Sequence, residues 1–197
     1  MPSTALTRYE TDRRQRLDEL LAAHRLVGGT GRGRRWRTQQ LNNSLVLRLA
    51  AEFQGFARDL HDLAGDTFAS WAAGGNTKLE TVLRARLSEA RQLDRGNAHP
   101  GSLGSDFGRF GFELWPALAA RDPRTASQQE SLELLNEARN AIAHDDEARL
   151  AALEAQGNPI TLRTFRAWQR DLDGLASTLD AEVAAHLGLL FQRATPW

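Results

Sequence analysis

Two long segments of the chain repeat apolar residues at steps of three and four, the spacing of one face of an α-helix. The first stretch, from about 38 to 63, carries this stripe at Leu41, Leu45, Leu49, Phe53, Phe56 and Leu60. The second has near-heptad spacing, at Phe165, Trp168, Leu172, Leu175, Leu179, Val183 and Leu187. Strand-like alternation is scarce and β-branched residues are few. The pattern predicts an all-α fold in which these two helices pack lengthwise in a bundle.

Shorter helical segments are expected around this pair. They are predicted at 4–26, near 67–73, at 77–93, at 110–119, at 127–143 and from about 147 to 155. The stretch 94–112 is rich in glycine and predicts a structured loop inserted in the middle of the bundle, anchored by aromatic residues. With no internal repeat and no convincing linker, residues 1–197 are interpreted as one helical domain.

The amino-acid composition excludes several classes of protein. Hydrophobic residues make up 41% of the 197, which is typical of a globular chain. No apolar run is long enough to span a bilayer, and the polar N-terminus predicts no signal peptide, so no membrane partner and a cytoplasmic location are expected. The absence of cysteine excludes disulfides and thiolate metal sites. Twenty-five basic and 25 acidic residues give zero formal net charge, so any nucleic-acid contact has to come from a local patch.

One such patch is the Gly-rich segment that joins the first two expected helices. It is interpreted as a mobile loop carrying Arg32, Arg34, Arg35, Trp36 and Arg37. It matches neither a P-loop nor a dinucleotide fingerprint. The arginines are candidates for holding an RNA backbone while a base stacks on the indole. The alternative is a solvated loop that Trp36 anchors to the bundle.

The most informative sequence is NEARNAIAHDD, residues 136–146. At about 100° per residue, Asn140 and His144 share one helix face, with Arg139 beside them. Small Ala141 and Ala143 would let another backbone approach. The pattern predicts that a guanidinium, an amide and an imidazole are presented together at a helix end.

These groups suit cleavage of RNA without a metal. Attack of a ribose 2′-hydroxyl on the adjacent phosphate needs a proton acceptor, and the leaving 5′-oxygen needs a proton donor; imidazole serves as either near neutral pH. Arg139 is a candidate to stabilise the charge that gathers on the phosphate oxygens, and Asn140 to orient His144 or bind the phosphate. The alternative from spacing alone is a helix-end histidine that caps carbonyl groups or favours the helix dipole.

The segment resembles the signature of HEPN domains, Arg-x(4–6)-His, in its form Arg-Asn-x-x-Ala-His, with Arg139, Asn140, Ala143 and His144 in order. The lead-in helix, the short helix that follows and the long final helix are similar to that fold as well. The resemblance implies a HEPN-type helical bundle that forms a homodimer around the motif. It implies that Arg139 binds the phosphate, that Asn140 assists and that His144 is the acid/base.

The same resemblance implies a metal-independent endoribonuclease of the toxin–antitoxin, abortive-infection or antiphage-defence branch. RNA would be its substrate, an antitoxin or another defence protein a possible partner, and neither cofactor nor metal would be needed. A non-catalytic HEPN module for dimerisation or ligand sensing is the alternative. A plain helical scaffold, with the Arg139 and His144 spacing a coincidence, is the third interpretation.

Two carboxylates are candidates for supporting roles. Glu52 lies close to the apolar stripe of the second helix, where pairing with Arg139 would orient that guanidinium; a boundary residue with a solvated carboxylate is the alternative. Asp145 is a candidate to orient His144, although its charge also repels phosphate. His61 has no partner at metal-ligand spacing, and His99 is expected to be structural or exposed.

Overall fold

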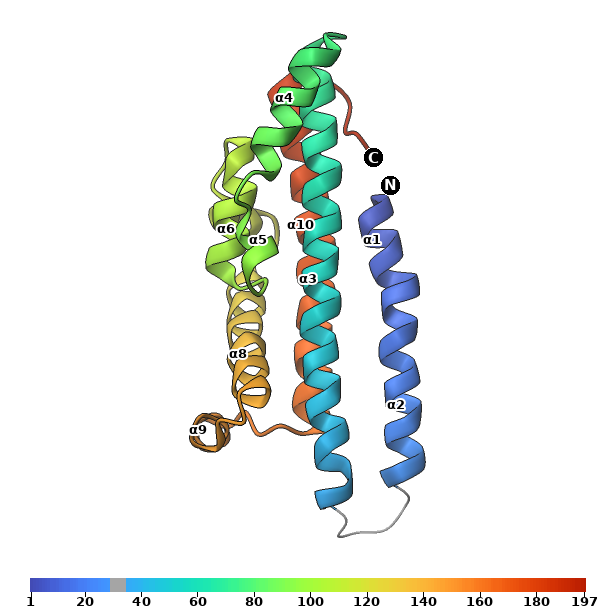
Figure 1. The fold of residues 1–197 in the computed structure, drawn as a ribbon, viewed down its shortest axis with the longest axis vertical. Helices are drawn as coiled ribbons and strands as arrows, with labels where there is room; N and C mark the ends of the chain where they lie inside the picture. Colours follow the sequence, from blue (N-terminus) through green and yellow to red (C-terminus); the bar gives the residue numbers. More distant parts are fainter. Residues whose placement is uncertain (29–34) are drawn as a thin grey trace.

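The two apolar stripes form the two longest helices, α3 (Arg35–Ala73) and α10 (Leu162–Phe191), which run side by side through the molecule (Figure 1). The computed structural model describes residues 1–28 and 35–197, and these ranges are all-helical, without a strand. The stripe residues of α10 are all buried, as are those of α3 except the half-buried Leu41. The all-α bundle predicted from periodicity is confirmed.

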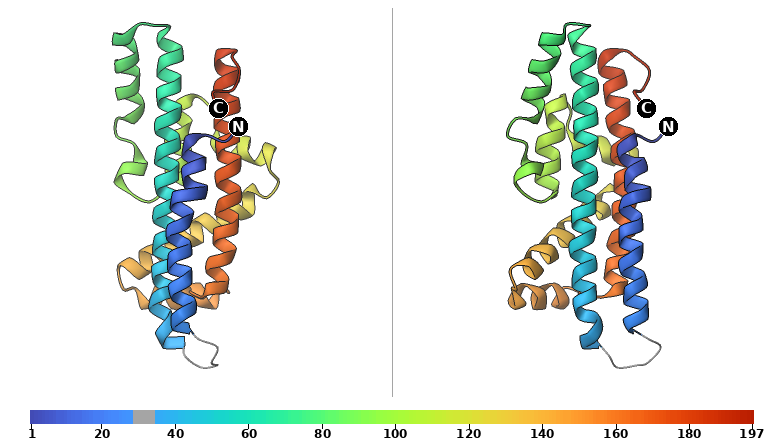
Figure 2. Two further views of the ribbon diagram at one scale, coloured as in Figure 1. Left: turned by 90° about the vertical axis from the view of Figure 1, so that its right-hand side faces the viewer. Right: turned by 45° about the vertical axis from the view of Figure 1, so that its right-hand side comes forward.

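The first predicted helix is a continuous helical arm made of α1 (Thr4–Arg8), a π-helical turn η1 (Tyr9–Arg13) and α2 (Arg14–Gly28). Ser3 caps it, because its hydroxyl accepts the N–H of Leu6 at 3.0 Å. The arm packs along α3 and contacts α10 at its start. Figure 2 shows that the N-terminus lies beside the C-terminal end of the chain.

The second predicted helix is longer than expected, since the piece near 67–73 is fused to it in α3. Gly65 lies inside α3 without interrupting it, and α4 (Thr77–Ser88) packs over this position: a β-carbon at Gly65 would lie 3.9 Å from Leu87. Helix α3 ends at Gly74 and Gly75, whose positive φ angles turn the chain back into α4.

The predicted loop at 94–112 is wrong, because most of it is helical. It contains α5 (Gln92–Arg95), α6 (Pro100–Phe107) and the 3-10 turn η2 (Gly108–Phe110), and α7 (Leu114–Arg121) follows. The glycines suggested a break, yet Pro100 fits the first turn of α6, and Leu103 and Phe107 are fully buried one turn apart. The aromatic anchoring was predicted correctly, since Phe107 and Phe110 lie in the core.

The buried carboxylate of Asp106 holds this region together. It accepts the N–H groups of Gln92 at 2.9 Å and Leu93 at 2.8 Å. These bonds satisfy two N–H groups at the start of α5, which has no side-chain cap at its N-cap residue Arg91.

The remaining elements place the candidate site at one end of the bundle. Helix α8 (Thr125–Ala143) packs on α3 and α10, and α9 (Glu147–Ala155) crosses its C-terminal end (Figures 1 and 2). A continuous hydrophobic core runs from α1 to α10. Across the described ranges, no helix combines the length and apolar character needed to cross a membrane.

Candidate active site

The motif residues lie where α8 ends, and a defined turn sets their direction. The N–H of Asp146 donates to the carbonyl of Ala141 at 2.9 Å, and the N–H of Asp145 to that of Ile142 at 3.4 Å. Together with a φ of +54° at Asp145, these bonds form a Schellman motif. Asp146 then caps α9, since its Oδ1 accepts the N–H of Arg149 at 2.9 Å. Both aspartates therefore have a structural task at the α8–α9 corner.

One face of α8 carries Asn136, Asn140 and His144 at steps of four residues, and all three line one open pocket of about 460 Å³. The other walls come from the segment before α6 and from the first turn of α9. They contribute Asn97, His99, Asp146 and Arg149, while α8 itself adds Glu137 and Ala141. The structure therefore brings Asn140 and His144 together, as the spacing predicted.

Asn140 is held by two donors at its side-chain oxygen. Asn97 Nδ2 donates to Asn140 Oδ1 at 2.8 Å, and Arg139 Nη1 donates to the same atom at 3.0 Å. This network assigns the oxygen side of the amide and leaves its NH₂ group to face away from these two donors. Within the described residues, Asn140 Nδ2 has no hydrogen-bond acceptor, so it is free to donate to a ligand.

His144 is exposed at the C-terminal cap of α8. Its backbone N–H donates to the carbonyl of Asn140 at 3.0 Å, which fixes the position of the residue. In the part of the chain that the structure describes, its imidazole makes no hydrogen bond or ion pair. The backbone thus fixes where the side chain starts, and the ring itself is available to a bound molecule.

Arg139 is half-buried beside Asn140 and is not among the pocket-lining residues. Its guanidinium contact to Asn140 orients the amide from the outside of the pocket. Of the two small residues expected to admit another backbone, Ala141 is buried within its own chain and Ala143 is exposed. A second chain could therefore approach the backbone closely at Ala143.

His99 lines the same pocket and caps α6. Its Nδ1 accepts the N–H groups of Gly101 at 3.1 Å and Ser102 at 3.3 Å. The segment that carries it is tied to α8, because Asn136 Nδ2 donates to the carbonyl of Ala98 at 3.0 Å. His99 thus has the structural role expected for it, as the cap of α6, and it also lines the pocket.

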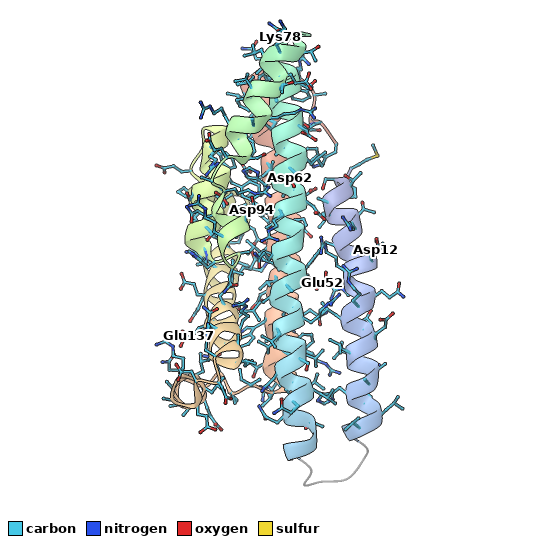
Figure 3. All side chains as sticks on the ribbon, viewed as in Figure 1. Asp12, Glu52, Asp62, Lys78, Asp94 and Glu137 are labelled. Atoms are coloured by element: carbon cyan, nitrogen blue, oxygen red, sulfur yellow. The ribbon has the colours of Figure 1, made fainter. Side chains whose placement is uncertain are left out.

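An ion pair closes one side of the pocket. Arg149 Nε lies 2.7 Å from Glu137 Oε1, which joins α9 to α8 (Glu137 is labelled in Figure 3). The Arg149 side chain is 58% exposed, so solvent screening weakens the pair and leaves the guanidinium accessible to an anion.

The expected pairing of Glu52 with Arg139 is not what the structure shows. Glu52 is buried between α2 and α3, where it contacts Arg13 at 3.0 Å, Arg16 at 2.8 Å and Arg48 at 2.6 Å (Figure 3). Burial alone would raise the pKa of Glu52, but hydrogen bonds from Arg16 and Arg13 outweigh it and lower that pKa below its usual value. Glu52 thus ties the first helical arm to α3.

The candidate RNA-binding segment lies mostly outside the described residues. Arg32 and Arg34 fall in the range 29–34, outside the described part. Arg35, Trp36 and Arg37 begin α3, but their side chains are likewise outside it. The proposed contact of this segment with RNA stays a prediction.

Sequence reasoning missed the pocket's Asn97, His99, Asn136 and Arg149. A signal existed for Asn136, because it lies one turn before Asn140 on the same face. His99 was detectable as a cap, since it precedes Pro100 at a helix start. Asn97 and Arg149 come to the pocket through long-range packing, which local spacing does not reveal.

Comparison of the chain with protein-family models, with curated proteins and with solved structures found no match.

Proposed function

We propose that the chain is a metal-independent endoribonuclease of HEPN type, acting as a toxin or antiviral defence effector. The observation that carries the proposal is the shared pocket of Asn140 and His144, with an oriented amide and an unengaged imidazole. The Arg139–Asn140…His144 resemblance to the HEPN signature supports the same reaction.

The reaction transfers the phosphate to the neighbouring hydroxyl. The 2′-oxygen gives its proton to an imidazole and bonds to phosphorus, while the bond from phosphorus to the 5′-oxygen breaks. A second proton donor protonates the 5′-oxygen, which leaves a 2′,3′-cyclic phosphate and a 5′-hydroxyl end. His144 is the proton-transfer group, and Asn140 donates its N–H to a phosphate oxygen.

A homodimer completes this site. Arg139 lies outside the pocket that holds His144 of its own chain, so the motif guanidinium reaches that pocket from a second copy and adds to the chain's own Arg149. A two-fold arrangement at the α8–α9 corner also supplies two copies of His144, one to accept and one to donate a proton.

Cleavage of a labelled RNA in EDTA tests the proposal, with the wild type compared with His144→Ala and His24→Ala. Loss of a general acid or base lowers a rate by roughly 10²–10⁴-fold, which is expected for His144→Ala. His24→Ala is the matched control, because His24 contacts Asn42 instead of the pocket. If the folded wild type cuts none of a broad set of RNAs, the non-catalytic module becomes the better interpretation.

A further inference from the structure

His99 carries its proton on a defined nitrogen. Two backbone N–H groups, of Gly101 and Ser102, donate to Nδ1. A nitrogen that accepts a hydrogen bond is unprotonated, so the neutral ring has its proton on Nε2. The cap of α6 therefore makes the imidazole of His99 an Nε2–H donor, with the tautomer assigned from these contacts.

The ring is also fixed in place. It lies over Gly101, where an added β-carbon would come within 2.9 Å of His99 Cε1 and 3.2 Å of Nδ1. The two residues before His99 are tied to α8: Asn97 Nδ2 donates to Asn140 Oδ1 at 2.8 Å, and the carbonyl of Ala98 accepts from Asn136 Nδ2 at 3.0 Å. The donor thus belongs to a segment that α8 holds in register with Asn140 and His144.

We propose that His99 is a second functional imidazole of the pocket, which donates Nε2–H to a non-bridging phosphate oxygen of bound RNA. The inference rests on the proposed ribonuclease function and adds a substrate contact from outside the motif. His99, the amide of Asn140 and the exposed guanidinium of Arg149 are three hydrogen-bond donors on the lining of one pocket, and each suits a phosphate oxygen. The carboxylates of Glu137 and Asp146 are each already engaged, the first by the Arg149 ion pair and the second by the N–H of Arg149 at the start of α9.

The first experiment needs no catalysis. Nitrogen-15 correlation spectra of the histidine rings, recorded with and without inorganic phosphate, report the protonated nitrogen and its contact. The proposal predicts an Nε2–H tautomer for His99 and a phosphate-dependent shift at Nε2. An Nδ1–H tautomer, or no shift at phosphate concentrations that perturb Asn140, overturns the proposal even if the protein cuts RNA.

Two variants then test the contact in the reaction. His99→Asn keeps a side-chain acceptor for the cap of α6 and removes the Nε2–H donor. Gly101→Ala favours the helix but displaces the ring. Removal of one preorganised donor lowers kcat by roughly 10²–10³-fold, which is expected for His99→Asn. A smaller loss in the same direction is expected for Gly101→Ala.

Sulfur substitution separates a substrate contact from a structural effect. Replacing one non-bridging oxygen by sulfur slows the wild type if His99 donates to that oxygen, and the slowing disappears in His99→Asn. An equal sulfur effect in both proteins, or unchanged kcat in His99→Asn, contradicts the proposal. If the wild type cuts no RNA, the proposed function fails, and the phosphate spectra alone decide whether His99 binds an anion.

Discussion

Asp145, the residue after the C-terminal cap of α8, occupies a left-handed backbone conformation that side chains with a β-carbon rarely adopt. Asp145→Gly removes this strain while keeping the Schellman hydrogen bonds. We expect the free energy of unfolding to rise by roughly 0.5–1 kcal/mol, measured by urea denaturation. Asp145→Val is the matched control and should destabilise the protein, because a β-branched residue fits this conformation poorly. A loss of stability in Asp145→Gly would contradict the structural role given to this residue.

His61 makes stability depend on pH. Burial, followed by the nearby Arg91 guanidinium, lowers the pKa of His61 to about 4. In the unfolded chain the ring titrates near 6.5, so the unfolded state binds the extra proton as pH falls below that value. We expect stability to be full above pH 6.5 and to fall by roughly 3 kcal/mol towards pH 4.

Urea denaturation across this range measures the effect. His61→Gln is the control, since a glutamine side chain does not titrate and the variant should lose this part of the pH dependence. The lower absolute stability of the variant does not affect the test, because the comparison is between the changes of unfolding free energy with pH. An unchanged slope in His61→Gln would assign the dependence to other groups.

Two glycines inside α3 differ in what lies beside them. A β-carbon at Gly55 would come within 2.2 Å of Arg13 Nη1, in the guanidinium that binds Glu52. Gly55→Ala displaces that ion pair and should cost about 1–2 kcal/mol despite the better helix propensity of alanine. Gly65→Ala is the matched control and should stabilise by roughly 0.5–1 kcal/mol, because its nearest neighbour is at 3.9 Å. Thermal denaturation compares them; equal effects would contradict the packing described for Gly55.

The helices that sequence predicted well are those whose apolar period is strong. The apolar stripes predicted that α3 and α10 are helices and that they pack against each other, because burial of one helix face leaves a repeat in the sequence. The region around α6 was missed, since its stability comes from the buried Asp106 carboxylate and from His99, not from local propensity. The Asp106 contacts span more than a dozen residues and leave no local pattern, whereas the His99 cap was readable from its place before Pro100.

The candidate site shows the same division. Asn140 and His144 were predicted to share a face because helix geometry alone decides this. The ion-pair partners of Glu52 were not predicted, since Arg13 and Arg16 reach its carboxylate from a separate helical arm. The same applies to the far wall of the pocket, where His99 arrives through the packing of α6 beside α8.

At the scale of the molecule, the α8–α9 corner is the end where a second copy is proposed to bind (Figure 1). Ala143 is exposed there beside His144, so Ala143→Arg should block a close two-fold contact and lower RNA cleavage together with the dimer fraction. Ala72→Arg is the control, because Ala72 is exposed near the opposite end of α3. Sedimentation velocity measures the dimer fraction. A dimer that tolerates Ala143→Arg would place the interface elsewhere.

The most direct measurement is the chemistry of the RNA ends that the wild type produces in EDTA. The account predicts a 2′,3′-cyclic phosphate and a 5′-hydroxyl, formed by attack of the neighbouring 2′-hydroxyl. It also predicts that one 2′-deoxynucleotide at the cleaved position blocks the cut there. Products with a 3′-hydroxyl and a 5′-phosphate, or undiminished cutting at the deoxynucleotide, would contradict the account.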